Sequence, residues 1–461
     1  MKKYLLILLT ACLCLPLTAQ TEEPFDNVFD EQEADTLLAV PIDTLPYPQY
    51  IQQRLDSIIG HSRLLKTTQL GLMVYDLDAD TAIYVHNHRQ TMRPASTMKI
   101  VTAVTALDKL GGNYQLRTSL YYMGKIEHHV LTGNLVCVGG MDPAFNVDDM
   151  AAFVESVRQL GVDTIQGRIL ADRSFKDGDL LGEGWCWDDD NPQLSPLLVG
   201  KKDNFVERFA AALKDQGIVL VDTLLQPTMK TQVCTRSHTI DQVLGPMMKD
   251  SNNLFAESLY YQLASSGGNR PAKASHARQY EQQLIQRLGL NPADYKLADG
   301  SGLSLYNYVS PELLVRLLRF ARLNANVADH LLPALPIAAV DGTLKGRMAG
   351  NYTFGNVQAK TGTLTGISSL AGYCTAAGGH HLCFAIINQG VLRAAEGRTF
   401  QDRVCEALCT PSGVSLTPPK PVAKPSKPRA SVKSRKSGNS GKSGKSGKSA
   451  KTKKTTKKKK R

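Results

Sequence analysis

The stretch Arg93–Leu107 reads as the entrance to a buried helix with a serine on its first turn. A proline is tolerated at the first position of a helix, as Pro94 would be, and residues three apart share a helix face. Ser96 and Lys99 are therefore expected side by side. Apolar residues recur at intervals of three and predict a buried stripe: Met98, Val101, Val104 and Leu107.

The pair Ser96 and Lys99 suits nucleophilic catalysis only under a condition. A serine hydroxyl is a weak nucleophile until a base takes its proton. A lysine can be that base only if burial or a neighbouring cation lowers its pKa. We therefore predict a second cation nearby. On its own, Ser-x-x-Lys also fits an N-cap serine followed by a surface lysine.

Two further motifs follow in order along the chain. Ser251-Asn252-Asn253 is a Ser-x-Asn triplet, and Lys360-Thr361-Gly362-Thr363 contains Lys-Thr-Gly. Each is common, but the ordered set is a known signature of serine acyl-transfer enzymes. The set favours a catalytic role for Ser96 over the interpretation as an N-cap serine.

The positive charge of the chain is unevenly placed. Net charge is +12 over 461 residues, but Pro418–Arg461 holds many Lys and Arg and no acid, so the body is mildly acidic. Residues 1–19 resemble a secretory signal peptide, which predicts export to the periplasm or envelope. Leu9–Cys12 also resembles a lipoprotein cleavage box. We expect 413–461 to be a disordered basic tail with a possible anionic envelope surface as partner.

The cysteines and histidines do not form a metal-ligand pattern. There is no Cys-x-x-Cys and no His-Glu-x-x-His, so neither a metal nor another cofactor is predicted. The pairs His128-His129 and His380-His381 are expected to be solvated. Cys405 and Cys409 read as buried thiols, with a disulfide as the alternative.

Strand patterns at both ends with helices between them predict an α/β sandwich with an antiparallel sheet, interrupted by a smaller inserted domain. The expected domains are a flexible acidic linker at 20–47, a catalytic domain at 48–123 and 232–412, and the insert at 124–231. The helices are expected at 50–65, 148–160, 253–263, 273–288, 311–324 and 394–409. The strands are expected at 70–75, 81–85, 119–123, 135–138, 168–171, 357–362, 368–375 and 382–388.

With these motifs the chain resembles penicillin-binding proteins of the D-alanyl-D-alanine carboxypeptidase and endopeptidase type. The resemblance runs from Gln69 to Cys409 and includes Asp299–Ser304 and Asp341–Leu344. It implies a β-lactamase- and transpeptidase-like fold, peptidoglycan stem peptides as substrates and β-lactams as covalent inhibitors. The chain departs in having Leu305 where the family often has Arg, and in a shorter interval before Ser-x-Asn.

The resemblance also assigns roles. It makes Ser96 the nucleophile, Lys99 the group that takes its proton, and Ser251 a proton relay. Asn253 would bind the substrate backbone. The residues of the third motif would hold the substrate carboxylate: Lys360, Thr361, Gly362 and Thr363.

The insert contains Trp185-Cys186-Trp187-Asp188-Asp189. Three consecutive acids repel one another, so a partner cation is favourable. By resemblance, Asp189 would pair with the side-chain amine of the diamino acid in the stem. The alternative is an acidic surface turn.

Other functions fit parts of the sequence. A β-lactamase or an esterase of the same fold is the nearest rival, but no Glu-x-x-x-Asn stretch plainly supplies the class A deacylating glutamate. A non-catalytic penicillin-recognising sensor should have lost Ser96 or Lys99, and this chain has both. No nucleic acid is expected, because a signal peptide argues against it.

Overall fold

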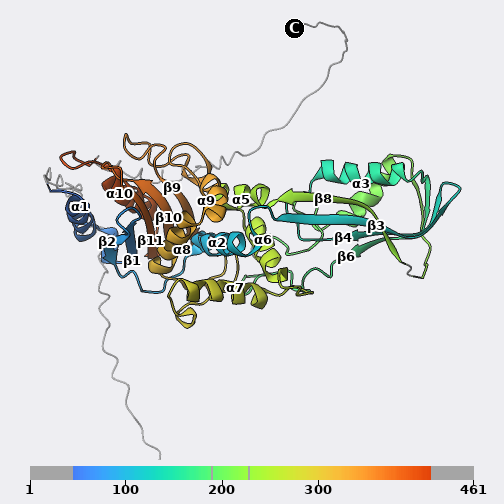
Figure 1. The fold of residues 1–461 in the computed structure, drawn as a ribbon, viewed down its shortest axis with the longest axis horizontal. Helices are drawn as coiled ribbons and strands as arrows, with labels where there is room; N and C mark the ends of the chain where they lie inside the picture. Colours follow the sequence, from blue (N-terminus) through green and yellow to red (C-terminus); the bar gives the residue numbers. More distant parts are fainter. Residues whose placement is uncertain (1–44, 188–190, 227–228, 417–461) are drawn as a thin grey trace, which may run out of the picture. The chain divides into compact units, whose positions relative to one another are not determined.

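The computed structural model describes residues 45–187, 191–226 and 229–416. The predicted signal peptide, nearly all of the linker, Asp189 and the basic tail lie outside these ranges. The described residues group as one compact unit that carries two β-sheets. Figure 1 shows the ribbon of this unit.

The first sheet is antiparallel and has the order β2-β1-β11-β10-β9. Its strands are β1 (Gln69–Asp76), β2 (Thr81–His86), β9 (Gln358–Leu364), β10 (Gly366–Thr375) and β11 (His381–Val391). Alternate residues of β11 enter different hydrophobic clusters, with Phe384 on one side and Ala385 on the other. Because side chains alternate along a strand, the sheet is buried on both faces.

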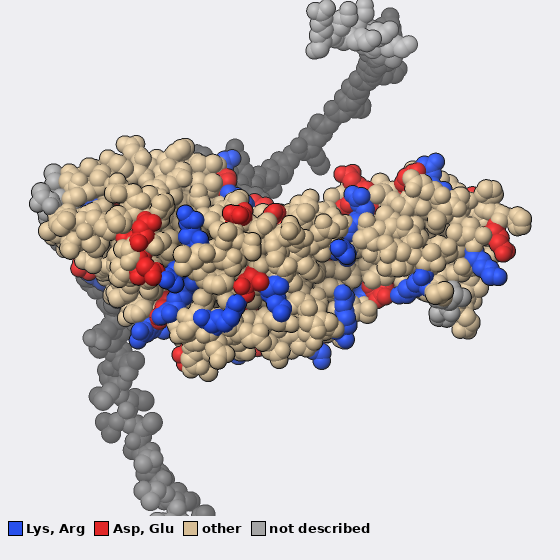
Figure 2. Space-filling model, viewed as in Figure 1, with Lys and Arg blue, Asp and Glu red and all other residues tan. Residues whose placement is uncertain are grey.

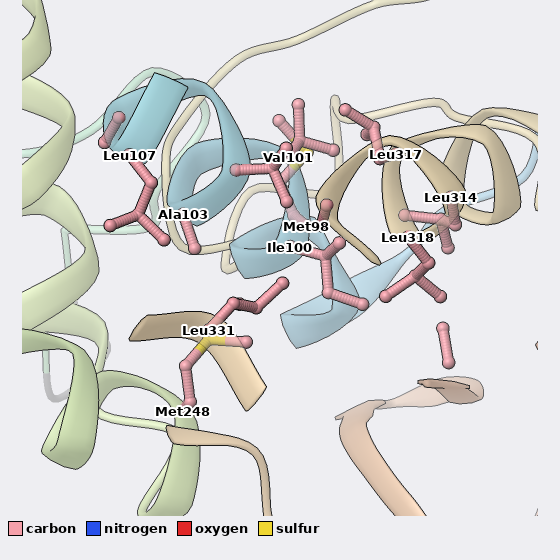
Figure 3. Packing of buried hydrophobic residues seen from close by; sticks show 14 of the residues in the cluster. Met98, Ile100, Val101, Ala103, Leu107, Met248, Leu314, Leu317, Leu318 and Leu331 are labelled. Atoms are coloured by element: carbon pink, nitrogen blue, oxygen red, sulfur yellow. The ribbon is translucent and has the colours of Figure 1, made fainter. Parts of the chain in front are cut away.

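Helices cover both faces of this sheet. On one face, α10 (Ala394–Cys409) packs on β10 and against α1 (Gln49–Gly60). On the other, α8 (Pro311–Leu323) packs on β11 and against α2 (Met98–Leu110). In Figure 3, side chains of α8 lie against those of α2. The other helices on this side are α5 (Ile240–Lys249), α6 (Asn253–Ser265), α7 (Ala274–Arg287) and α9 (Ala325–Ala334).

The second sheet has the order β7-β5-β4-β3-β8, with β6 paired to β4. Its strands are β3 (Gln115–Glu127), β4 (Val130–Val138), β5 (Thr164–Gln166), β6 (Ile169–Asp172), β7 (Val219–Val221) and β8 (Lys230–Thr239), and its helices are α3 (Val147–Gln159) and α4 (Phe205–Asp215). The sheet begins before Gly124 and ends after Thr231, so both predicted insert boundaries fall inside strands. Strand β8 pairs with β3 and ends at Thr239, directly before α5 begins at Ile240.

The structure confirms the α/β sandwich with an antiparallel sheet. It confirms the helix Ala394–Cys409 to the residue and the hairpin of β1 and β2. The predicted helix at 50–65 is shorter, ending at Gly60 before a 3₁₀ turn at Leu64–Lys66. Prediction missed α4, α5, α9, β5, β7 and β8. Cys405 and Cys409 are buried free thiols, as the preferred interpretation had it.

The described surface carries both signs of charge. On the face in Figure 2, Lys and Arg lie among Asp and Glu. None of the described helices combines the length and the apolar character that crossing a membrane requires.

Candidate active site

Ser96 lies in a 3₁₀ turn, Ala95–Thr97, and the α-helix begins only at Met98. Two hydroxyl groups stabilise the turn. Thr97 Oγ1 donates to Pro94 O at 2.7 Å, and Ser369 Oγ donates to the same oxygen at 2.6 Å. Ala95 has φ +48°, a strained value for a non-glycine residue. Ser96 remains partly exposed.

Lys99 is fully buried one turn further on. Its Nζ donates to Ser96 Oγ at 3.0 Å, Asn253 Oδ1 at 2.7 Å and Ser301 O at 2.7 Å. Burial lowers the pKa of Lys99 to about 7, although Asp299 and Glu257 act to raise it. The amine is therefore partly neutral near pH 7, as a base for Ser96 requires.

Ser251 and Asn253 lie where α5 ends and α6 begins. Ser251 has φ +58°, and the side chain of Asn252 accepts from Phe255 N to cap α6. Asn253, the first residue of α6, points its Oδ1 to Lys99. The strained turn thus brings the second motif to the first.

Lys360 is fully buried on β9, and its Nζ donates to Ser251 Oγ at 2.9 Å and Thr361 O at 2.8 Å. It is the neighbouring amine predicted from the sequence. Burial and the charge of Lys99 hold the pKa of Lys360 well below its usual range. Burial is the largest cause of the lowered pKa of both amines. Repulsion between two positive charges is mutual, so each amine disfavours the charged form of the other.

Gly362 is required by close approach to the serine turn. A Cβ at this position would lie 2.1 Å from Ser369 Oγ, 2.7 Å from Pro94 O and 3.0 Å from Ser96 N. The third motif therefore packs directly on the nucleophile turn. Thr361 Oγ1 donates to Thr343 Oγ1 at 2.8 Å from the 3₁₀ turn Gly342–Leu344, and Thr363 is exposed beside it.

Sequence reasoning missed the contribution of two buried acids. The loop Asp299–Ser304 belonged to the resemblance but had no assigned role, and it supplies the Ser301 carbonyl to Lys99. Asp299 and Glu257 bind the backbone N–H groups of this loop. The signal was present in Glu257, which follows Asn253 by one helical turn and so faces the same side of α6.

A cavity of about 660 Å³ adjoins Asn253. Its wall combines Asn252 and Asn253 with residues of the insert: Asn191, Gln193, Lys201, Lys202 and Asn204. Asp189 lies outside the described residues, but Asn191 begins the next described segment and lines this cavity. The insert thus contributes to the space beside the three motifs.

Among the described residues, one group of side chains has donor atoms close enough for a metal ion: Asp76, Asp78 and His380. They lie at the far end of β1, away from Ser96. Both oxygens of Asp76 already accept hydrogen bonds, one of them from Tyr47. The ring of His380 stacks on Tyr47 with 4.0 Å between centroids and its side chain is 35% exposed, so His380 is only partly solvated.

The three motifs thus converge on one site between the sheet and the helices. Lys99 bonds to Ser96 and Asn253, and Lys360 bonds to Ser251. This is the site of a penicillin-binding protein of the serine D,D-peptidase type.

The comparisons specify the family. Residues 51–200 and 198–409 match the D-Ala-D-Ala carboxypeptidase 3 (S13) family. The chain belongs to this family, and is by that membership an enzyme of the serine carboxypeptidase type.

Two curated relatives agree with this assignment. The chain is 25% identical over 410 residues to a D-alanyl-D-alanine carboxypeptidase DacB of Haemophilus influenzae, covering 70% of this chain and 85% of the relative. It is 26% identical over 440 residues to a D-alanyl-D-alanine carboxypeptidase of Actinomadura sp., covering 74% and 81%.

Solved structures share the fold. Penicillin-binding protein 4 (dacB) of H. influenzae matches with TM-score 0.67 and 23% identity, over 78% of this chain and 98% of that one. A predatory endopeptidase of Bdellovibrio bacteriovorus, solved with an immunity protein, matches with TM-score 0.53 and 16% identity, over 77% and 95%.

Proposed function

We propose that this enzyme cleaves the D-Ala-D-Ala bond of peptidoglycan stem peptides through an acyl-enzyme on Ser96. The observation that carries the proposal is the 3.0 Å contact between Lys99 Nζ and Ser96 Oγ, with the lysine buried and its pKa lowered to about 7. Ser96 Oγ bonds to the carbonyl carbon of the penultimate D-alanine while Lys99 takes the hydroxyl proton. The C–N bond then breaks, and water later hydrolyses the ester.

Ser251 would return the proton to the leaving amine. In support, it accepts a hydrogen bond from Lys360 and precedes Asn253, the partner of Lys99, by two residues. A proton that has reached Lys99 could pass through Ser251 to the nitrogen of the departing D-alanine. Asn253 is left with its amide N–H groups for the carbonyl of the substrate backbone.

The third motif would bind the terminal carboxylate. Lys360 has a lowered pKa in the free enzyme, but a carboxylate beside it favours the protonated form. Substrate binding is thus expected to charge Lys360. Thr361 and Thr363 would add hydroxyl donors to the same carboxylate.

The oxyanion hole would combine the backbone N–H groups of Ser96 and Thr363. Support comes from Gly362, whose missing side chain lets β9 lie against Ser96 N. Donors fixed in this way before the reaction are typically worth about 3 kcal/mol of barrier.

Fluorescent penicillin labelling tests the assignment. Wild-type protein is expected to label covalently, and Ser96→Ala to remain unlabelled with the same melting temperature. Ser237→Ala, an exposed serine in β8, is the matched control and should label like wild type. Labelling of Ser96→Ala at the wild-type rate would reject Ser96 as the nucleophile. Rapid loss of the label with release of hydrolysed penicillin would instead indicate a β-lactamase.

We also propose that the enzyme cleaves peptide cross-links, as the resemblance implies. Mass spectrometry of digested muropeptides separates the two activities. A carboxypeptidase removes one alanine from a monomeric stem, whereas an endopeptidase converts cross-linked dimers to monomers. Dimers that survive digestion while monomeric stems lose alanine would limit the activity to carboxypeptidase.

Export and the role of the tail are proposals from the sequence alone. With residues 1–19 as a signal peptide, the available polyanions are lipid phosphates and cell-wall polymers. Pro418–Arg461 is then expected to hold the enzyme to the envelope in a salt-dependent way. Envelope sedimentation at low salt should fall when the tail is removed. Equal sedimentation with and without the tail would reject adhesion.

A further inference from the structure

The peptide group between Ser301 and Gly302 lies between the catalytic lysine and a buried acid. Its carbonyl oxygen accepts from Lys99 Nζ at 2.7 Å, and its N–H donates to Asp299 Oδ1 at 2.7 Å. A peptide bonded at both ends is polarised by each partner, so the two bonds strengthen each other. One peptide thus links the lysine to the carboxylate.

Gly302 has no room for a side chain. It has φ +78°, and a Cβ there would lie 1.9 Å from Ala95 O, next to the nucleophile. The neighbouring peptide is held as well, since Gly300 O accepts from Thr102 Oγ1 at 2.8 Å and Ser301 N donates to Glu257 at 2.7 Å. The direction of the Ser301 carbonyl is therefore fixed.

Asp299 is fully buried and accepts five hydrogen bonds, which is how an ionised carboxylate bonds. Two come from backbone N–H groups, of Gly302 and Ser304, at 2.7 Å. One comes from the insert: Trp185 Nε1 donates to Oδ2 at 2.8 Å. The other two donors are Ser301 Oγ and Asn307 Nδ2.

We propose that Asp299 is a positioning residue for Lys99, that it acts through the Ser301–Gly302 peptide, and that the indole of Trp185 holds it in place. This rests on the proposed function, in which neutral Lys99 takes the proton of Ser96. A neutral amine has two N–H donors and one lone pair. Ser301 O and Asn253 Oδ1 can only accept, so they take the two donors and leave the lone pair facing Ser96 Oγ.

Asp299 also contributes to the charge that Lys99 faces. Burial and Asp299 raise the pKa of Glu257 to about 8, and burial raises the pKa of Glu281 well above its ordinary range. A raised pKa reduces the negative charge that Glu257 and Glu281 place near Lys99. The titratable and charged groups around this cluster are Lys99, Glu257, Tyr260, Tyr261, Arg278, Glu281, Asp299 and Lys360.

Two variants should move the acid limb of the pH profile in opposite directions. Trp185→Phe removes one hydrogen-bond donor to Asp299 and keeps an aromatic ring. With one donor fewer, the negative charge of Asp299 stabilises the protonated form of Lys99 more strongly. Its limb should shift to higher pH by about half a unit. Asp299→Asn removes the charge, so its limb should shift to lower pH. Its plateau rate should fall about tenfold, because the amide group cannot accept from all five donors.

The assay is the rate of acylation by fluorescent penicillin from pH 5 to 9, with full-length protein and near-UV circular dichroism to check folding. Trp187→Phe is the matched control, because Trp187 is 84% exposed, and should keep the wild-type profile. If Asp299→Asn does not fold, Trp185→Phe decides alone.

Lower plateaus without a shift of the limb, or shifts in the same direction, would overturn the proposal and leave Asp299 a structural residue. Failure of the proposed function is distinguishable, because wild type itself would then not label on Ser96.

Discussion

Substitution of Gly362 by alanine should separate folding from catalysis. The added Cβ would lie 2.1 Å from Ser369 Oγ, whereas ordinary contact begins at 3.4 Å. It would also lie 2.7 Å from Pro94 O and 3.0 Å from Ser96 N, and these are backbone atoms that cannot rotate away. Strand β9 and the serine turn must therefore separate by about 1 Å.

The cost falls on two quantities. Crowding of a packed interior typically costs about 1–3 kcal/mol of the free energy of unfolding. A displacement of about 1 Å between catalytic groups can cost about 100-fold in rate. We therefore expect Gly362→Ala to fold with a lower melting temperature and to acylate about 100-fold more slowly.

The assay compares acylation by fluorescent penicillin with thermal unfolding. Gly346→Ala is the matched control, since a Cβ there meets nothing within 4 Å, and should acylate like wild type. The double variant Gly362→Ala/Ser369→Ala removes the nearest clash but leaves Ser96 N, so it should recover some stability and little rate. A wild-type acylation rate in Gly362→Ala would refute the argument that this glycine sets the approach of β9 to Ser96.

Three further predictions follow from the same geometry. Because neutral Lys99 is the base and burial lowers its pKa to about 7, acylation should rise with pH through about 7 and level off above it; a flat rate between pH 5 and 9 would contradict this. Lys360→Ala should slow acylation about 10- to 100-fold by removing a charge-assisted contact to the substrate carboxylate; an unchanged rate would make Lys360 a structural residue. Asp189→Asn should raise the barrier to cleavage of stems with a free diamino-acid amine by about 1–2 kcal/mol and leave benzylpenicillin acylation unchanged. Equal losses of rate for both substrates would make Asp189 a structural residue.

The catalytic motifs were predictable because their chemistry is local. Ser96 and Lys99 are one helical turn apart, so their contact follows from spacing. The order of the three motifs then brought in Asn253 and Lys360 by resemblance. Spacing could not show that Ser96 would lie in a 3₁₀ turn, because one of the two hydroxyl donors to Pro94 O is Ser369, which is distant in the sequence.

Some misses had a usable signal. In α4, Phe205, Phe209 and Leu213 recur at intervals of four and are all buried, which is the pattern of an amphipathic helix. In α5, buried apolar residues also recur at helical spacing. The sequence did not predict this helix because Gly245 and Pro246 both disfavour a helix interior. The edges of the insert had no such signal, because β3 and β8 run unbroken across them.

The two amines depend on burial, which motif spacing does not show. Lys99 and Lys360 are both fully buried, and burial is the largest cause of the lowered pKa of each. Asp299 and Glu257 favour the charged form of Lys99, whereas the charge of Lys99 disfavours the charged form of Lys360. The two amines therefore suit different tasks in the proposed mechanism. A pKa of about 7 suits Lys99 as a base, and Lys360 would bind the substrate carboxylate, which favours its charged form.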